Sequence, residues 1–569
     1  MKKMKRIAAG AATLAMIASM ALAMPMTASA EATKYSGIIT GSSAKDSALT
    51  GSVTYEDKSD TDKTITSYNA AELKKILVIK DDANIPKVSF DYTASAGTAV
   101  AATTTTHAVL AGVNPAEIKW VEEKTKTVAN ANDTFDVDNV GEHLTTGKAG
   151  ASFKLNYAAQ DVHDDNGGKI TGTVDTNTMA AGSDNVLLNN TSTAVDGNST
   201  DVYYAIKTMR LDFTECGFTE PGIYRYLITE DATDQDGVTY DPTLTRTIDV
   251  YVADATYTPY TSGTAGETQN KLRIAGYVMY KGRVTAAPAK PGTASAGTAS
   301  KLEDGLDNTA KGDNGAYYGT PNGYEVSGQT KSEGFKNSYI THNITFSKEV
   351  TGNQASKDKF FKFKVEIKNA TIGNVFDVDI TNAEGSVPDT DTVNAATQNS
   401  YASQINAAQL VADASKTLAA DGYTFTLNSG SDSVGTITAY YYLQHGDKIV
   451  VKGLPDKTSY AITESQEDYT PALVLTGDTT NGVDTTTGTE INNTLTVVKP
   501  GEDDADWTAG YVDTALKDDA DAKFTNTREG TIPTGVILSI AAPAAVGAAA
   551  IGGIAFILIR NKRRKSEEE

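Results

Sequence analysis

Short runs of alternating apolar and polar residues recur through most of the chain. Residues 247–252, 361–367 and 447–451 are examples, and turn sequences such as the Asp-Gly pair at 236–237 separate such runs. Alternation with a period of two buries one face of a strand, and frequent turns join antiparallel neighbours. The pattern therefore predicts an all-β protein built from β-sandwiches. Only residues 403–419 have a helical pattern, and we expect a helix there.

One order of residue types occurs twice, which predicts two tandem Ig-like sandwich domains at about 66–340 and 341–530. In each, a lysine lies on an early strand, a glutamate ends a late Ile-Thr-Glu strand, and an asparagine lies two residues after a phenylalanine on the closing strand. The two triplets are Lys75, Glu230 and Asn337, then Lys348, Glu464 and Asn526. The spacings differ, so the domains carry different long insertions. The largest covers about 98–200, and its pattern assigns it no fold.

A lysine, a glutamate and an asparagine that meet inside a dry sandwich can react with one another. Burial disfavours charge, so it lowers the pKa of a lysine and raises that of a carboxyl. The neutral amine is a nucleophile, and the protonated carboxyl can polarise the amide and pass a proton to departing ammonia. The product is a Lys–Asn isopeptide bond, formed once, without cofactor or metal. At the first site Lys74 competes with Lys75, but Lys75 shares a strand face with Leu73 and Leu77.

The two ends of the chain predict export and anchoring. Residues 1–30 combine a basic start, an apolar run and Ala-Ser-Ala, the form of a secretory signal peptide that is cleaved after Ala30. Residues 536–559 are apolar and precede a basic cluster, as in a transmembrane helix with a cytoplasmic stop. Such a helix is roughly 36 Å long, enough for a bilayer core of about 30 Å. We therefore expect an extracellular protein that the membrane holds transiently.

These features resemble the major pilins of Gram-positive bacteria, especially the two-domain streptococcal type with intramolecular isopeptide bonds. The resemblance rests on residues 73–92, 218–252, 335–363, 445–469 and 524–569. It implies that each lysine is bonded to the asparagine of its own triplet, with Glu230 and Glu464 as the promoting acids. It also implies a structural subunit of a surface fibre that supports adhesion, not an enzyme.

Residues 531–569 resemble a cell-wall sorting signal. The sequence Thr-Ile532-Pro533-Thr534-Gly535 departs from the common Leu-Pro-X-Thr-Gly form and is similar to a variant found in such pilins. Proline fixes a kink before the scissile bond, and glycine leaves steric room after it. The resemblance implies that a sortase cleaves after Thr534. The partners would be that sortase, further copies of the chain, peptidoglycan, tip or base pilins and host ligands.

Polymerisation also needs a lysine that accepts Thr534 from the next subunit. In the resembling pilins this lysine lies a few residues before the closing strand of the first domain. Here that region holds Lys331, in an expected loop, and Lys336, on the outer face of the expected strand. We predict Lys331 because a second protein must reach the acceptor. Lys336 is the next candidate, followed by Lys281 and Lys311.

Composition and motif spacing exclude several other classes of function. The net charge of −22 argues against nucleic acid as a partner, and a single cysteine excludes an intramolecular disulfide. The candidate calcium loops near residues 162–173 and 232–243 lack the required acidic ligands. No paired acid and base has the spacing of a glycoside hydrolase. The alternative is a singly wall-anchored adhesin that binds a host glycan or protein, with 98–200 as its binding segment.

Overall fold

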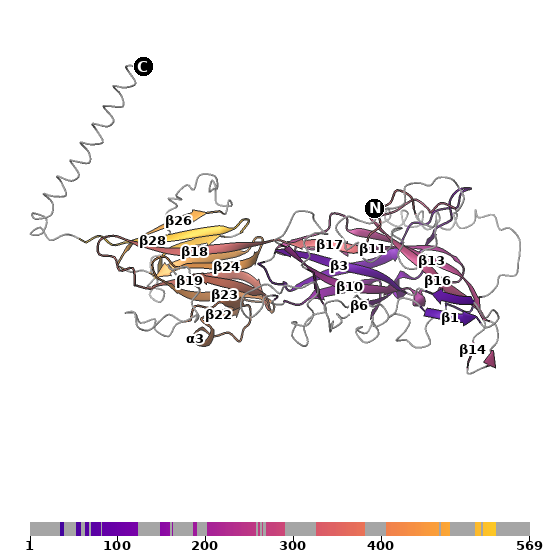
Figure 1. Cartoon of the computed structure of the whole chain (residues 1–569), viewed down its shortest axis with the longest axis horizontal. Helices are drawn as coiled ribbons and strands as arrows, with labels where there is room; N and C mark the ends of the chain where they lie inside the picture. The colour runs from indigo at the N-terminus through magenta and orange to yellow at the C-terminus, as the bar shows by residue number, and fades with distance from the viewer. Residues whose placement is uncertain are drawn as a thin grey trace, which may run out of the picture.

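The computed structural model is mostly β-structure, arranged as two elongated bodies that lie end to end (Figure 1). It describes residues 35–38, 53–57, 63–67, 70–80, 82–122, 148–159, 162, 186–189, 202–257, 260–261, 264–265, 269–290, 326–381, 405–465, 468–477, 507–513 and 516–530.

Two sheets enclose the first core. The first sheet has the strand order β12-β17-β3-β10-β6-β7, with β9 also paired to β10; the second has the order β16-β13-β11-β4-β8, with β5 paired to β11. The bounds in the first sheet are β12 Val238–Thr239, β17 Gly334–Tyr339, β3 Ala70–Lys80, β10 Val202–Asp212, β6 Lys119–Glu122, β7 Lys148–Ala149 and β9 Leu187–Asn189. Those in the second are β16 Gln269–Lys281, β13 Thr245–Tyr257, β11 Gly222–Asp231, β4 Val88–Ala96, β8 Ser152–Tyr157 and β5 Leu110–Ala111.

Two further sheets enclose the second core. The third sheet has the order β21-β20-β24-β18-β28-β26, and the fourth has the order β22-β23-β19-β25-β27. The bounds are β21 Gln409–Val411, β20 Val375–Thr381, β24 Lys448–Pro455, β18 Thr341–Thr351, β28 Ala520–Thr527, β26 Thr470–Thr476, β22 Tyr423–Leu427, β23 Val434–Leu443, β19 Phe361–Thr371, β25 Ser459–Ser465 and β27 Trp507–Asp513. Smaller elements are the hairpins β1 Val53–Asp57 with β2 Lys63–Ser67 and β14 Tyr260–Thr261 with β15 Thr264–Ala265, the 3₁₀ turns η1 Pro115–Glu117 and η3 Thr214–Cys216, and the helix α3 Leu418–Asp421.

Period-two burial explains how each pair of sheets closes on its core. In β28 the buried positions are Ala520, Ala522, Phe524 and Asn526, and the residues between them are at least partly exposed. One core draws its apolar residues from 71–339 and the other from 344–524. The prediction of a mostly-β fold is thus confirmed. The Ig-like topology and the domain boundaries at 66–340 and 341–530 stay predictions.

One expectation about an individual segment is wrong. The described part of 403–419 is not a helix: β21 lies within it, paired to β20, and only the single turn α3 begins at its end. The segment 98–200, for which the sequence predicted no fold, contributes strands to the first core in its described parts. They supply β5 to β9, and Trp120 and Tyr157 lie in the first core. In both segments the backbone N–H and C=O groups are hydrogen-bonded to neighbouring strands, and the local sequence pattern does not show this pairing.

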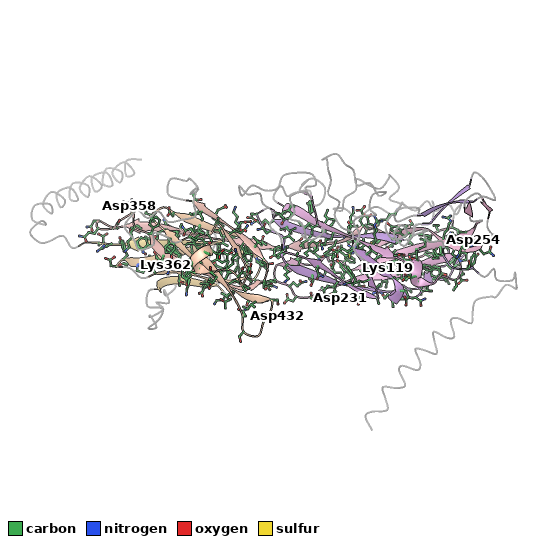
Figure 2. The ribbon with its side chains drawn as sticks, turned by 90° about the horizontal axis from the view of Figure 1, so that it is seen from below. Lys119, Asp231, Asp254, Asp358, Lys362 and Asp432 are labelled. Atoms are coloured by element: carbon green, nitrogen blue, oxygen red, sulfur yellow. The ribbon has the colours of Figure 1, made fainter. Side chains whose placement is uncertain are left out.

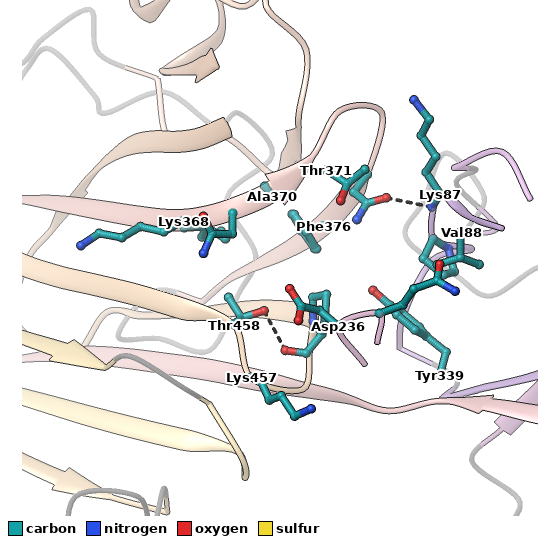
Figure 3. A pocket seen from close by; sticks show the side chains of 16 residues that line it. Lys87, Val88, Asp236, Tyr339, Lys368, Ala370, Thr371, Phe376, Lys457 and Thr458 are labelled. Carbon is teal, nitrogen blue, oxygen red and sulfur yellow. Dashed lines mark hydrogen bonds between the residues drawn. The ribbon is translucent and has the colours of Figure 1, made fainter. Parts of the chain in front are cut away.

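Hydrogen bonds join the two bodies at their junction. The Asn343 side chain donates to Asp82 at 2.7 Å, that of Asn84 to Asp377 at 2.8 Å, and the Lys87 backbone N–H to Asn374 at 2.9 Å. A pocket of about 150 Å³ lies here, between residues such as Lys87 and Tyr339 of one body and Thr371 and Lys457 of the other (Figure 3). Asp231, the last residue of β11, lies at the end of the first body that faces this junction (Figure 2).

Candidate functional site: two buried Lys, Glu and Asn triplets

The first triplet meets between the two sheets of the first core. Lys75 on β3, Glu230 on β11 and Asn337 on β17 are all fully buried. Strands β3 and β17 are parallel neighbours, with Phe335 opposite Lys75 and Asn337 opposite Leu77. Because side chains alternate along a strand, Lys75 and Asn337 point to the same inner face. Glu230 approaches from the opposite sheet and its Oε1 accepts a hydrogen bond from Lys75 Nζ.

Aromatic residues of β4 surround this ion pair. The Lys75 ammonium lies 3.8 Å from the centre of the Phe90 ring, and the Tyr92 hydroxyl donates to Glu230 Oε1 at 2.9 Å. Burial lowers the pKa of Lys75 to about 8, although the adjacent Glu230 carboxylate opposes that shift. The neutral amine is therefore easier to form than in an exposed lysine, although the charged form still predominates at neutral pH.

Two polar atoms of the first triplet lack partners among the described residues. The carbonyl oxygen of Asn337 accepts the backbone N–H of Asp241 at 2.9 Å, but its Nδ2 makes no hydrogen bond. Glu230 Oε2 is likewise buried without a partner. Each such group costs about 1–3 kcal/mol. Both atoms take part in the reaction predicted from the sequence. Asn337 Nδ2 is the leaving nitrogen, and Glu230 Oε2 is the second oxygen of the carboxyl that promotes the reaction.

The second triplet has the same plan inside the second core. Lys348 on β18, Glu464 on β25 and Asn526 on β28 are buried. Lys348 Nζ lies 2.5 Å from Glu464 Oε1, which also accepts a hydrogen bond from Asn526 Nδ2 at 3.0 Å. The Lys348 ammonium lies 4.3 Å from the centre of the Phe361 ring. Burial again lowers the pKa of the lysine, to about 8, against the opposing effect of Glu464.

The two sites share their strand register. In each, first and last strands are parallel neighbours, the lysine lies opposite a phenylalanine, and the asparagine lies opposite the residue two places after the lysine. In each, the residue opposite the glutamate lies two places after the phenylalanine that contacts the lysine. That residue is Tyr92 in the first site and Phe363 in the second. The second site therefore lacks the phenol that donates to Glu230.

Lys74 occupies the other face of β3. Its Nζ lies 2.9 Å from Glu333 Oε2, so its ion-pair partner is distinct from Glu230. The geometry thus brings Lys75, and not Lys74, to Glu230; the choice of Lys75 for the cross-link stays a prediction.

The expected exposure of Lys331 is wrong. Its side chain is buried, next to an isolated bridge between Lys331 and Tyr280 at the edge of the second sheet. Lys336 and Lys281 are half-buried, and Lys311 lies outside the described residues. The loop pattern at 328–334 gave no indication of this bridge, because its partner lies about 50 residues earlier in the chain.

Several predicted features lie outside the described residues. These are the signal peptide 1–30, the sorting motif with Ile532, Pro533, Thr534 and Gly535, and the apolar span 536–559. Within the part of the chain that the structure describes, no helix is long and apolar enough to cross a membrane.

The sequence reasoning missed the residues that enclose the first triplet. Phe90 and Tyr92 could have been found from their period-two spacing, which matches that of Phe361 and Phe363. The sequence around Asp241 indicates only a turn, because a proline follows it, and gives no sign that this residue contacts Asn337.

Comparisons place the chain near pilins at low similarity. A family model described as a domain of unknown function, DUF7601, matches residues 342–528. No curated protein matches. The major pilin of Streptococcus pyogenes is 17% identical with a TM-score of 0.36, over 81% of this chain and 99% of that one. The T-13 major pilin of that species is 16% identical with a TM-score of 0.34, over 84% and 99%. A pilus-presented adhesin is 13% identical with a TM-score of 0.19, over 57% and 90%.

Proposed function

We propose that each triplet forms an intramolecular Lys–Asn isopeptide bond, Lys75 to Asn337 and Lys348 to Asn526. The observation that carries this proposal is the same buried geometry, in the same strand register, at two sites. A proton moves from the lysine ammonium to the contacting glutamate, which leaves a neutral amine to attack the amide carbon. Glu230 or Glu464 then passes that proton to the leaving nitrogen, and ammonia departs.

The position of each bond suits a protein under tension. Strands β3 and β17 begin and end the sequence of the first core, and β18 and β28 do so for the second. Tension along the chain loads these strands, and a covalent link between them carries force past the hydrogen-bonded core. Such links take the place that disulfides have in other exported proteins, which a chain with a single cysteine cannot form.

We propose further that the chain is the major subunit of a surface fibre. A sortase would cleave after Thr534, join that residue to a lysine of the next subunit, and attach the completed fibre to peptidoglycan. The sorting sequence supports this role, and so does the end-to-end arrangement of the two bodies (Figure 1). For the acceptor we now favour Lys336, because it is more exposed than the buried Lys331.

Gel electrophoresis of native surface material distinguishes a fibre subunit from a singly anchored adhesin. Boiled in detergent, this material should give a ladder of covalent multimers, and a branched peptide should join Thr534 to a lysine of the first domain. A single sharp band would favour the adhesin. A branch within 341–530 would refute the placement of the acceptor.

Intact mass tests the internal bonds directly. The folded fragment 31–534 should weigh less than its sequence by two ammonia molecules, and the unmodified mass would refute both bonds. Lys75→Ala should restore one ammonia, whereas Lys74→Ala should not, because Lys74 pairs with Glu333 on the other face. Equal effects of these adjacent substitutions would contradict the assignment of Lys75.

A further inference from the structure

The turn between β12 and β13 places one backbone N–H against the reacting amide of the first site. Asp241 is buried in this turn, and its N–H donates to Asn337 Oδ1 at 2.9 Å. Only the carbonyl oxygen of the amide can accept from an N–H, so this contact fixes the orientation of Asn337. It leaves Nδ2, the leaving nitrogen, directed elsewhere.

The Asp241 side chain fixes the turn. One carboxylate oxygen accepts the Thr243 N–H at 2.8 Å, and the other accepts from Arg246 at 2.7 Å and from the Lys336 N–H at 3.2 Å. Although burial alone would raise the pKa of Asp241, the Arg246 guanidinium and these N–H groups hold it below its ordinary value. The carboxylate therefore stays charged and the turn stays closed.

Arg246 is in turn held by the closing strand. It is fully buried, its Nε donates to Ser332 Oγ and to the Gly334 carbonyl, each at 2.7 Å, and its guanidinium lies 4.5 Å from the centre of the Phe335 ring. Phe335 lies two residues before Asn337 on β17. We call Asp241 and Arg246 the clamp, since together they tie the turn to the strand that carries the amide.

We propose that the Asp241 N–H is an oxyanion donor for the first isopeptide bond and that Arg246 positions it. This inference rests on the proposed cross-linking. When Lys75 Nζ bonds to Cγ of Asn337, the electron pair of the carbonyl moves to Oδ1, where the N–H already donates. The Cγ–Nδ2 bond then breaks, Glu230 protonates the leaving nitrogen, and one Lys75 proton restores the carboxyl. A preorganised donor at such an oxygen stabilises the transition state more than the ground state.

The second site has no equivalent donor among the described residues. Asn526 Oδ1 is buried without a hydrogen-bond partner, and its Nδ2 donates to Glu464 instead. Among the described residues the clamp belongs to the first site alone, so the first bond should form before the second in one chain. The rate at which the second bond forms therefore serves as an internal reference for any substitution made at the first site.

Replacing a single peptide bond by an ester tests the donor. Cell-free translation with a suppressor tRNA that carries the α-hydroxy analogue of aspartate removes the N–H of residue 241 and keeps the side chain. Loss of one such donor should slow ammonia loss at Lys75–Asn337 by about 100-fold. The rate of ammonia loss at Lys348–Asn526 should be unchanged. Timed quenching, digestion and mass spectrometry follow both bonds in the same sample.

Side-chain variants decide the case if the ester chain does not fold. Arg246→Gln, which removes the guanidinium that holds the Asp241 carboxylate, should slow the formation of the first bond at least about tenfold. Arg225→Gln is the matched control, because it breaks another buried ion pair, with Asp249 at 2.7 Å, on the outer face of β11. Equal slowing by Arg246→Gln and Arg225→Gln would overturn the inference.

The outcomes also separate this inference from the proposed function. If the wild-type chain loses no ammonia at the first site, the cross-linking itself is wrong. If it does, and the ester chain reacts at the wild-type rate, only the role of the Asp241 N–H is wrong.

Discussion

Glu464→Ala should abolish the Lys348–Asn526 bond and leave the second domain folded but much less stable. The carboxylate is the only acid in contact with Lys348 Nζ in the described part of the site, whereas the core packing comes from other residues. Treated like a disulfide that closes a loop of this length, the bond contributes about 5 kcal/mol. For a domain of this size, that loss lowers Tm by roughly 10–20 °C. Intact mass and calorimetry on the same sample measure both effects.

Two controls separate the bond from the charge. Glu349→Ala removes a partly exposed acid of β18, the strand that carries Lys348. This acid pairs with Lys523 at 2.7 Å, and its loss should cost about 1 kcal/mol or less. Asn526→Ala keeps the Lys348–Glu464 ion pair but removes the electrophile. This variant should also lose only one ammonia molecule, and its Tm should fall by a similar amount. A Glu464→Ala chain that still loses two ammonia molecules would refute the role of this acid.

The rate of bond formation should stay level below about pH 8 and fall above it. The resting pair of ammonium and carboxylate and the reactive pair of amine and carboxyl hold the same single proton, so their balance does not depend on pH. Because the pKa of each buried lysine is about 8, the pair loses that proton above this pH. The amine then remains without an acid, and the rate falls about tenfold per pH unit.

Unlinked chain, purified in guanidinium and diluted into buffers between about pH 6 and pH 10, gives this profile. Glu464→Gln is the informative comparison, since glutamine cannot deliver a proton. Its residual rate should rise with pH until the lysine is neutral, which is the opposite slope. A wild-type rate that also rises through pH 8 would show that amine deprotonation alone limits the reaction.

Much of this site could be predicted from the sequence because strand periodicity is local. Leu73, Lys75 and Leu77 share a face by their spacing alone, and so do Phe524 and Asn526; a polar residue at an inward position of an apolar strand is visible without coordinates. The repeated order of lysine, glutamate and asparagine added a second, independent indication. The mostly-β fold followed from the same alternation.

The failures concern residues whose environment depends on distant pairing. Lys331 has a loop-like sequence, but a bridge to Tyr280 places it at the edge of a sheet, where it is buried. Residues 409–411 have a helix-like pattern, but pairing with β20 makes them a strand. In both cases the partner strand determined the outcome, and that partner is not recorded in the local pattern.

The sequence by itself determined which residues are candidates for the proposed cross-links: two lysines at inward strand positions, two glutamates at strand ends and two asparagines on closing strands. Only the tertiary structure decided how they meet, because the parallel pairing of the first and last strands sets the offset between lysine and asparagine. It also decided that the two sites differ. The Asp241 N–H and the Tyr92 hydroxyl reach the first site through folding of the chain around it, and a sequence pattern with the period of a strand carries no record of such contacts.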